Sequence, residues 1–142
     1  DLVIASVHSR FKMPKEEMTK RVVTAIESGY MDVLGHPTGR LIGRRNPYEI
    51  DMDKVLDAAR ESHVAMELNS WKDRLDLADG HCRMAKAAGV KVAIGTDSHH
   101  VDELDFMRLG VITARRGWLE AGDVLNTMNA KDITRHLRGR RP

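Results

Sequence analysis

The stretch VAMELNSWKDRLDLADGHCRMAKAAGVKVAIG, residues 64–95, decides the fold class of this chain. It begins with a short apolar run at residues 64–69, continues through a helical pattern that Asp76 can cap and Gly89 can end, and closes on a second apolar run at residues 91–95. Two buried strands separated by one helix are typical of parallel pairing, because parallel strands need a crossover of a dozen or more residues. The spacing therefore predicts an α/β protein built of βα units.

The same alternation is present upstream. Residues 2–8 and 32–36 are two further short apolar runs, and each is followed by a helical pattern. The first helix is expected to begin at Pro14 and to stop at Gly29, with an apolar face formed by Met18, Val22, Ala25 and Ile26. The second is expected to begin at its cap, Asp51, with an apolar face formed by Val55, Leu56 and Ala59. Four parallel strands with helical crossovers follow from this pattern.

Downstream, helices are expected at residues 101–109 and near Asp123 and Lys131.

Composition limits the class of protein. Hydrophobic residues make up 42% of 142 residues, enough for a packed core, and the longest apolar runs are far shorter than the ~20 residues that span a bilayer. We therefore expect no membrane partner. A single cysteine, Cys82, excludes an internal disulfide and favours the cytoplasm. The net charge of +2 is too small to indicate a nucleic-acid partner by itself.

Polar side chains end all four expected strands. His8 ends the first, His36 the second and Asn69 the third, while Asp97 and His99 follow the fourth. Parallel strands bring these ends to one rim, where three imidazoles and a carboxylate have the composition of a site for zinc, manganese or iron. A lone histidine at a strand end is more often a hydrogen-bonded structural residue, so the recurrence at three ends is what favours metal ligands.

The chemistry of such a site is hydrolysis. Lewis-acid ions activate water and stabilise phosphoryl oxygens. The sequence contains no G-x-S-x-G or Cys–His pattern that would indicate a covalent mechanism. We therefore expect a metal-bound water as the nucleophile and assign no protein nucleophile.

Basic side chains gather in the long loops that leave the same end of the sheet. An anionic substrate, such as a phosphate monoester or a nucleic-acid backbone, would be drawn to this rim. The alternative, that the loops are charged only because they are solvated, has equal weight. The substrate-binding candidates on the rim are Asn69, Arg40, Arg44, Arg45, Arg74 and Arg115.

Six strings of the sequence resemble the PHP (polymerase and histidinol phosphatase) domain, in the version fused to the C-terminus of bacterial X-family DNA polymerases. The resemblance covers nearly the whole chain. The strings GHPTGR and ARRGW make it specific, whereas TDSHH alone would indicate only the superfamily. In full, the strings are SVHSRF at 6–11, LGHPTGRL at 34–41, ELN at 67–69, RLDL at 74–77, TDSHH at 96–100 and TARRGWL at 113–119.

The resemblance implies a distorted (β/α)7 barrel of TIM type that holds up to three divalent ions, manganese or zinc. By this resemblance His8 and His36 would share one ion with a bridging glutamate, Asp97 would hold a second ion and His99 a third. The family's His-x-His motif, that glutamate and two other histidines belong to the first half of the barrel and are not in this sequence, which begins with Asp1. Residues 1–142 would then be the C-terminal part of a PHP domain, the second half of its barrel, without the N-terminal half or any polymerase region.

The function implied by the resemblance is that of a metal-dependent phosphoesterase in an X-family DNA repair polymerase, acting as a 3′-5′ exonuclease and 3′-phosphatase on DNA ends. We expect the chain alone to be inactive, with the missing half supplied by another segment or a second copy. Two alternatives stay open. One is a small-molecule phosphatase of the histidinol-phosphatase type, and the other is a noncatalytic domain that binds DNA or supports a polymerase.

Overall fold

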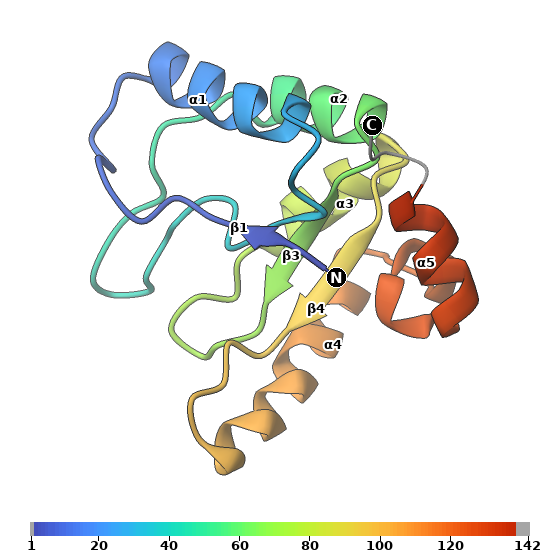
Figure 1. The fold of residues 1–142 in the computed structure, drawn as a ribbon. Helices are drawn as coiled ribbons and strands as arrows, with labels where there is room; N and C mark the ends of the chain where they lie inside the picture. Colours follow the sequence, from blue (N-terminus) through green and yellow to red (C-terminus); the bar gives the residue numbers. More distant parts are fainter. Residues whose placement is uncertain (1, 139–142) are drawn as a thin grey trace.

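The computed structural model describes residues 2–138 and places four parallel strands in one sheet (Figure 1). The order in the sheet is the order in the sequence, so each strand is joined to its neighbour by a helical crossover. The strands are β1 (Ile4–Ala5), β2 (Val33–Leu34), β3 (Ala65–Asn69) and β4 (Val92–Gly95). This confirms the α/β architecture of parallel βα units. The described residues form an open four-stranded sheet, and the closed barrel stays a prediction.

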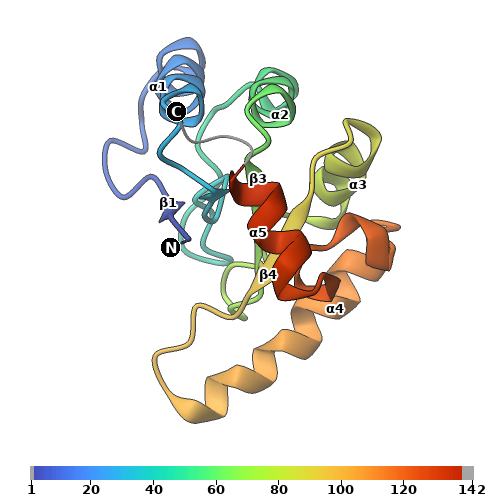
Figure 2. The ribbon, with the colours of Figure 1, turned by 45° about the vertical axis from the view of Figure 1, so that its right-hand side comes forward.

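Helices surround this sheet on both sides (Figures 1 and 2). The first four lie in an arc on one face, and the fifth lies on the other side of β4 (Figure 2). They are α1 (Lys15–Glu27), α2 (Met52–Glu61), α3 (Asp79–Ala87), α4 (Met107–Arg116) and α5 (Ala130–Arg138). Three short 3₁₀ helices complete the elements: η1 (Val101–Phe106), η2 (Ala121–Asp123) and η3 (Leu125–Thr127). No helix within residues 2–138 is long and apolar enough to cross a bilayer.

The core follows the two-residue alternation of the strands. Leu34, Met66, Leu68 and Val92 point to one face and pack against the first four helices. The residues between them point to the other face, where Val33, Ala65 and Ala93 meet Leu125 and Met128. Successive strand residues face opposite sides of a sheet, so both faces of this sheet carry apolar side chains.

The boundaries of α1 and α2 agree with the sequence signals. Pro14 precedes α1, and the chain turns away at Gly29, which adopts a φ of +77° that suits glycine. Asp51 caps α2 by accepting a hydrogen bond from the backbone N–H of Lys54 at 3.3 Å. The expectation for Ala25 was wrong, because its side chain is exposed. Thr19 is buried on that face instead, where its hydroxyl donates to the carbonyl of Lys15.

The expectation that Asp76 caps the third helix was wrong. The helix α3 begins at Asp79, three residues later. After β3 the chain folds back so that the backbones of Asn69 and Asp76 pair in an antiparallel bridge. This bridge carries Asp76 into the interior, where its carboxylate accepts a hydrogen bond from the backbone N–H of Thr38 at 3.0 Å.

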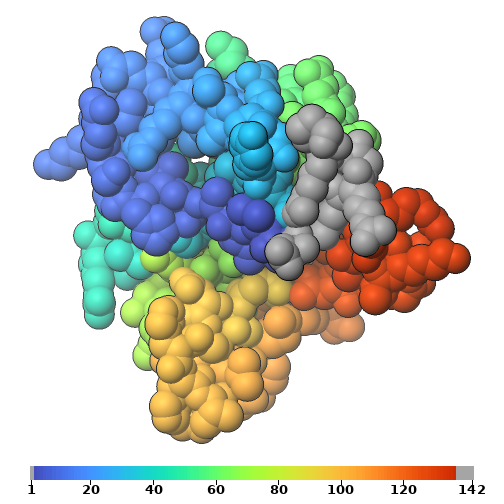
Figure 3. Space-filling model, in the orientation of Figure 1, coloured from blue at the N-terminus to red at the C-terminus, as the bar shows by residue number. Residues whose placement is uncertain are grey.

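The helix expected at residues 101–109 is longer and is divided in two. A 3₁₀ turn, η1, leads directly into α4, which passes through Gly110 and ends at Arg116. Gly110 serves packing here, because a Cβ atom at this position would lie 2.6 Å from Cγ2 of Ile94. In the space-filling view, η1 and the first turns of α4 project from the body of the molecule (Figure 3). The strand arrows of β3 and β4 point toward this projection (Figure 1).

The two edges of the sheet differ. The side-chain amide of Asn126 covers β4 by accepting from the N–H of Ile94 at 2.8 Å and donating to its carbonyl at 3.0 Å. At the other edge, the expected seven-residue strand shrinks to the two residues of β1, which pair with β2 alone. The side chains of Leu2, Val3 and Ile4 are 49%, 41% and 55% exposed there, so this edge carries an open apolar strip.

Candidate functional site

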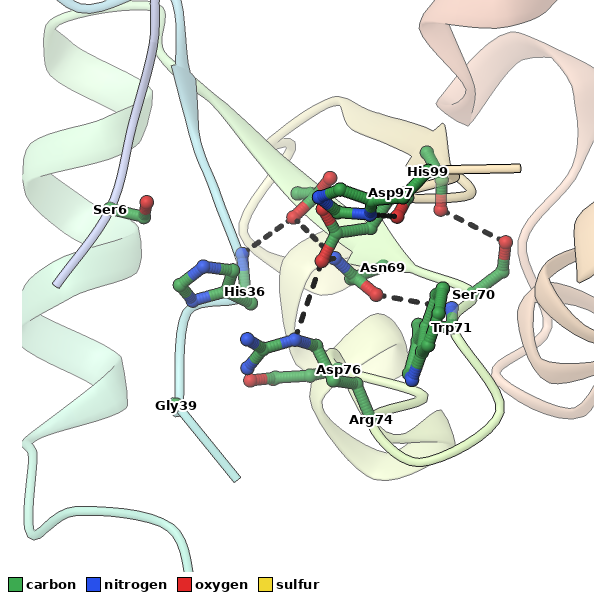
Figure 4. Close-up of polar contacts among 12 residues, drawn as sticks. Ser6, His36, Gly39, Asn69, Ser70, Trp71, Arg74, Asp76, Asp97 and His99 are labelled. Atoms are coloured by element: carbon green, nitrogen blue, oxygen red, sulfur yellow. Dashed lines mark hydrogen bonds and ion pairs between the residues drawn. The ribbon is translucent and has the colours of Figure 1, made fainter. Parts of the chain in front are cut away.

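The strand ends meet at one rim, as the sequence predicts for parallel strands. His36 follows β2, Asn69 ends β3 and Asp97 follows β4, and their side chains lie together in Figure 4. The ring of His8, after β1, approaches the ring of His36 edge-on, with 5.2 Å between the ring centroids. The fold therefore collects side chains from four consecutive βα units.

Asn69 is the centre of the polar network on this rim (Figure 4). Its side-chain N–H donates to the Asp97 carboxylate at 3.1 Å, and its side-chain oxygen accepts from the backbone N–H of Trp71 at 3.1 Å. Asn69 is fully buried, so its amide plane is fixed by these bonds. The network orients the Asp97 carboxylate from the side of β3.

His36 is buried and ready to act as a ligand. Its Nδ1 atom is buried without a hydrogen-bond partner among the described residues. Burial lowers the pKa of this imidazole, and the neighbouring Arg74 guanidinium lowers the pKa further. A neutral imidazole with a free ring nitrogen is the form that binds metal ions. The backbone of His36 has a φ of +29°, a conformation that residues other than glycine rarely adopt.

The two other predicted histidines are exposed. The Nδ1 atom of His99 lies 2.8 Å from the backbone oxygen of Asp97, which can only accept, so the neutral tautomer that fits this contact has its proton on Nδ1 and its lone pair on Nε2. The Nε2 atom of His8 lies 2.7 Å from the hydroxyl of Ser6. The His99 ring also meets the ring of Trp71 edge-on, with 6.1 Å between centroids.

Glu67 is a site residue that the strand-end pattern missed. Its carboxylate accepts from the backbone N–H of His36 at 2.6 Å and lies 3.4 Å from the side-chain nitrogen of Asn69. Burial raises the pKa of Glu67. The sequence does carry a signal, because strand alternation puts Glu67 on the same face as Asn69 in an otherwise apolar strand.

The donors on the rim fit part of a metal shell. Within residues 2–138, no three His, Cys, Asp or Glu side chains are close enough to hold an ion by themselves. The fit is nevertheless favourable for the donors present, because His36 offers an unpartnered buried nitrogen beside His8 and Asp97 offers an oriented carboxylate. A full shell would require further donors.

The basic candidates separate into three groups. Arg74 lies at the centre, with its Nε atom 3.4 Å from the Asp97 carboxylate and its Nη1 atom buried without a partner among the described residues. Arg40 donates to the carbonyls of Arg74 and Leu75, and Arg45 donates to the carbonyl of Gly39 while its guanidinium stacks 3.8 Å above the ring of Phe11. These two guanidinium groups therefore hold loops together. The exposed group comprises Arg44, in a loop turn, and Arg115, in the last turn of α4.

Comparison with known proteins gives a consistent set of relatives. No family model matches the sequence. The chain is 46% identical over 138 residues to the DNA polymerase/3′-5′ exonuclease PolX of Bacillus subtilis (strain 168), a match that covers 97% of this chain and 24% of that protein. It is 35% identical over 108 residues to a probable phosphatase of Thermoanaerobacter sp. (strain X514), covering 70% of this chain and 42% of the relative.

A third relative is a probable phosphatase of Vibrio parahaemolyticus serotype O3:K6, 32% identical over 137 residues, with 89% of this chain and 52% of that protein covered. The chain thus spans about a quarter of PolX and about half of the two phosphatases. It is accordingly similar to a PolX-related phosphoesterase region.

Proposed function

We propose that residues 1–142 form the C-terminal part of a PHP-type domain and contribute to a metal-dependent phosphoesterase of an X-family DNA repair polymerase. One observation carries the proposal: the chain matches PolX at 46% identity over 97% of its length, and that match includes the rim where His8, His36 and Asp97 meet. The proposed activity is 3′-5′ exonuclease and 3′-phosphatase action on DNA ends.

Divalent ions, manganese or zinc, would be held by His8, His36, Asp97 and His99 together with donors from outside the described residues. When bound, such ions supply an activated water and stabilise charge on phosphoryl oxygens. Sites built of histidine and aspartate accept several first-row metals, so the proposal includes both manganese and zinc. His36 suits the role because its buried imidazole is held in the neutral form.

The chain's own residues orient the site and bind phosphate. Asn69 holds the Asp97 carboxylate at 3.1 Å from one side, and Arg74 approaches it at 3.4 Å from the other. The Arg74 guanidinium stands beside the Asp97 carboxylate with 17% of its side chain exposed, and we propose that it donates to a nonbridging oxygen of the substrate phosphate. Arg44 is free to reach the neighbouring DNA backbone from its exposed turn.

The open edge of the sheet supports a further part of the proposal, that additional strands come from another segment or a second copy. Among the described residues, Asn126 covers the β4 edge, whereas β1 pairs with β2 alone and exposes Leu2, Val3 and Ile4. An uncovered parallel edge with apolar side chains is a site for strand addition. The chain alone is then inactive, because residues 2–138 offer no complete donor set at the rim.

A second candidate function is a phosphatase for small phosphate esters of the histidinol-phosphatase type. The relatives named as probable phosphatases favour it. The two candidates differ in substrate size, and therefore in their dependence on the exposed basic loops.

The deciding experiment measures phosphate release with Mn²⁺ from a 3′-phosphorylated DNA oligonucleotide and from histidinol phosphate. The proteins compared are the 142-residue chain and a longer protein that contains it after a polymerase region. We expect His36→Ala to abolish hydrolysis in the longer protein and to leave polymerisation nearly intact, with Gly80→Ala as a control because a Cβ atom there meets nothing within 4 Å.

Equal loss of both activities in His36→Ala would point to a folding role for His36. Robust turnover by the 142-residue chain alone would contradict the requirement for additional strands. Faster hydrolysis of histidinol phosphate than of DNA would favour the second candidate. DNA binding without any metal-dependent hydrolysis would leave a noncatalytic role.

A further inference from the structure

We propose that Glu67 is a positioning residue of the strand-end site: its carboxylate holds the peptide of His36 and, through Asn69, the carboxylate of Asp97. The inference rests on the proposed function, in which His36 and Asp97 are metal ligands. Glu67 itself is outside that ligand set. Its role is to fix where two ligands from different strands stand relative to each other.

The first argument is the space that the sheet leaves for this side chain. Gly95 lies beside it on β4, and a Cβ atom there would sit 2.6 Å from Oε1 of Glu67. Gly35, after β2, is crowded by Ile4 instead, because a Cβ atom there would sit 3.1 Å from Cγ2 of Ile4 and at an ordinary contact distance of 3.5 Å from Oε2 of Glu67. Neither glycine has a positive φ, so backbone conformation does not explain them. At position 95, a Cβ atom would force the Glu67 carboxylate to shift from the place where it accepts the His36 hydrogen bond.

The second argument is the pattern of contacts. A single oxygen, Oε2, accepts from the backbone N–H of His36 at 2.6 Å and lies 3.4 Å from the side-chain nitrogen of Asn69. The same nitrogen of Asn69 reaches Asp97 at 3.1 Å. These contacts therefore link His36, which follows β2, to Asp97, which follows β4, through two side chains of β3.

The third argument is backbone strain at both ends of this chain of contacts. His36 has a φ of +29° and Asp97 a φ of +53°, values that cost side-chain-bearing residues energy. Such conformations persist only where the surroundings determine them. A short hydrogen bond from the His36 peptide to a buried carboxylate is a determinant of this kind.

Simple packing is a poorer explanation of Glu67. Burying a carboxylate has a large desolvation penalty, and an apolar side chain of similar size would fill the slot without it. An apolar residue would leave the N–H groups of His36 and Asn69 without this acceptor. The residue type at position 67 thus matches the needs of the rim rather than those of the core.

The test uses four variants of the 142-residue chain. Glu67→Ala removes the oxygen that accepts from the His36 N–H and faces the Asn69 side-chain nitrogen. Gly95→Ala pushes the carboxylate aside without changing it, and Glu67→Ala/Gly95→Ala removes both the carboxylate and the obstruction. Gly80→Ala is the matched control, because its added Cβ atom meets nothing. Thermal melting establishes that each variant is folded.

Two readouts are measured: hydrogen exchange of the His36 amide by NMR, and Mn²⁺ affinity by electron paramagnetic resonance. We expect Glu67→Ala and Gly95→Ala each to speed the exchange and to weaken Mn²⁺ binding about tenfold, within the range seen for residues that support metal ligands. In a Glu67→Ala background, Gly95→Ala should change either quantity less than about twofold. Gly80→Ala should change neither.

Unchanged Mn²⁺ affinity in folded Glu67→Ala, or a full additional effect of Gly95→Ala without Glu67, would overturn the proposal. The unaltered chain carries only part of the proposed donor set, so absence of Mn²⁺ binding by this chain would not count against the metal centre of the proposed function. In that case the hydrogen exchange of the His36 amide tests the role of Glu67 without any metal. If this exchange is unchanged in both single variants, the proposed role of Glu67 is wrong.

Discussion

Asp76 shows how one buried carboxylate can organise a loop. It accepts from the backbone N–H of Thr38 and so anchors the loop that follows His36. Burial raises the pKa of Asp76 above its ordinary value. The folded chain therefore holds this proton more tightly than the unfolded chain does, and the associated stability is full at low pH and is lost as pH rises through the folded pKa.

We expect Asp76→Asn to remove this pH dependence. The free energy of unfolding of the variant minus that of the unaltered chain should increase as pH rises from about 4, the ordinary pKa of an aspartate. If the substitution also changes stability by an amount that does not depend on pH, that amount does not alter how the difference changes with pH. Urea unfolding across pH 4 to 7 measures it, and a difference that stays flat or decreases with pH would contradict the assignment.

Arg44 and Arg45, in the loop after β2, have different roles although they are neighbours in the sequence. Arg45 is tied to Gly39 and Phe11, whereas Arg44 is exposed. We expect Arg45→Ala to lower the free energy of unfolding by about 1–3 kcal/mol, because a charged hydrogen bond is lost. Arg44→Ala should leave stability unchanged and reduce the salt dependence of DNA affinity by about one phosphate contact.

These two substitutions are compared by urea unfolding and by DNA titration at several salt concentrations. Arg83→Ala is the control, because its guanidinium stacks 3.9 Å above the ring of Trp118 on another part of the surface. A salt dependence identical to that of the unaltered chain in Arg44→Ala would remove this turn from the DNA-binding surface.

At the scale of elements, the cap of α2 is the clearest local signal. Replacing Asp51 with alanine removes the acceptor for the N–H of Lys54, and we expect a loss of about 1 kcal/mol in the free energy of unfolding. Asp57→Ala, on the same helix, should change stability by a few tenths of a kcal/mol, because its 3.6 Å ion pair with Arg60 is exposed. If urea unfolding shows the same loss of free energy of unfolding for both variants, the cap contributes no more than an exposed ion pair.

Local chemistry explains which elements could be predicted from the sequence. The cap at Asp51, the stop at Gly29 and the alternation of β3 act between neighbouring residues, so their signals survive without the fold. The backbone bridge between Asn69 and Asp76 has no local signal in the sequence. Because of this bridge Asp76 lies in the interior, although the sequence predicted it as a helix cap. The first strand was overestimated because its length depends on a partner strand rather than on its own apolar residues.

The rim of the whole molecule was predictable for a different reason. The ends of parallel strands must converge, so the meeting of His36, Asn69 and Asp97 follows from the order of elements alone. Glu67 could not be singled out in the same way, because its importance depends on the space beside Gly95 in a different strand. Contacts between strands become visible only when their register is known.

The exposed strip at β1 leads to an expectation for the molecule as a whole. Ile4 is 55% exposed in β1, the edge strand of the described sheet, so copies of the chain should associate through this edge at raised concentration. We expect Ile4→Lys to shift the chain toward the monomer without lowering its melting temperature, because a lysine on an edge strand opposes pairing. Tyr30→Lys is the control, since Tyr30 is 80% exposed in the connection between α1 and β2 and belongs to no strand. Sedimentation velocity distinguishes the two, and association that persists unchanged in Ile4→Lys would place the contact elsewhere on the surface.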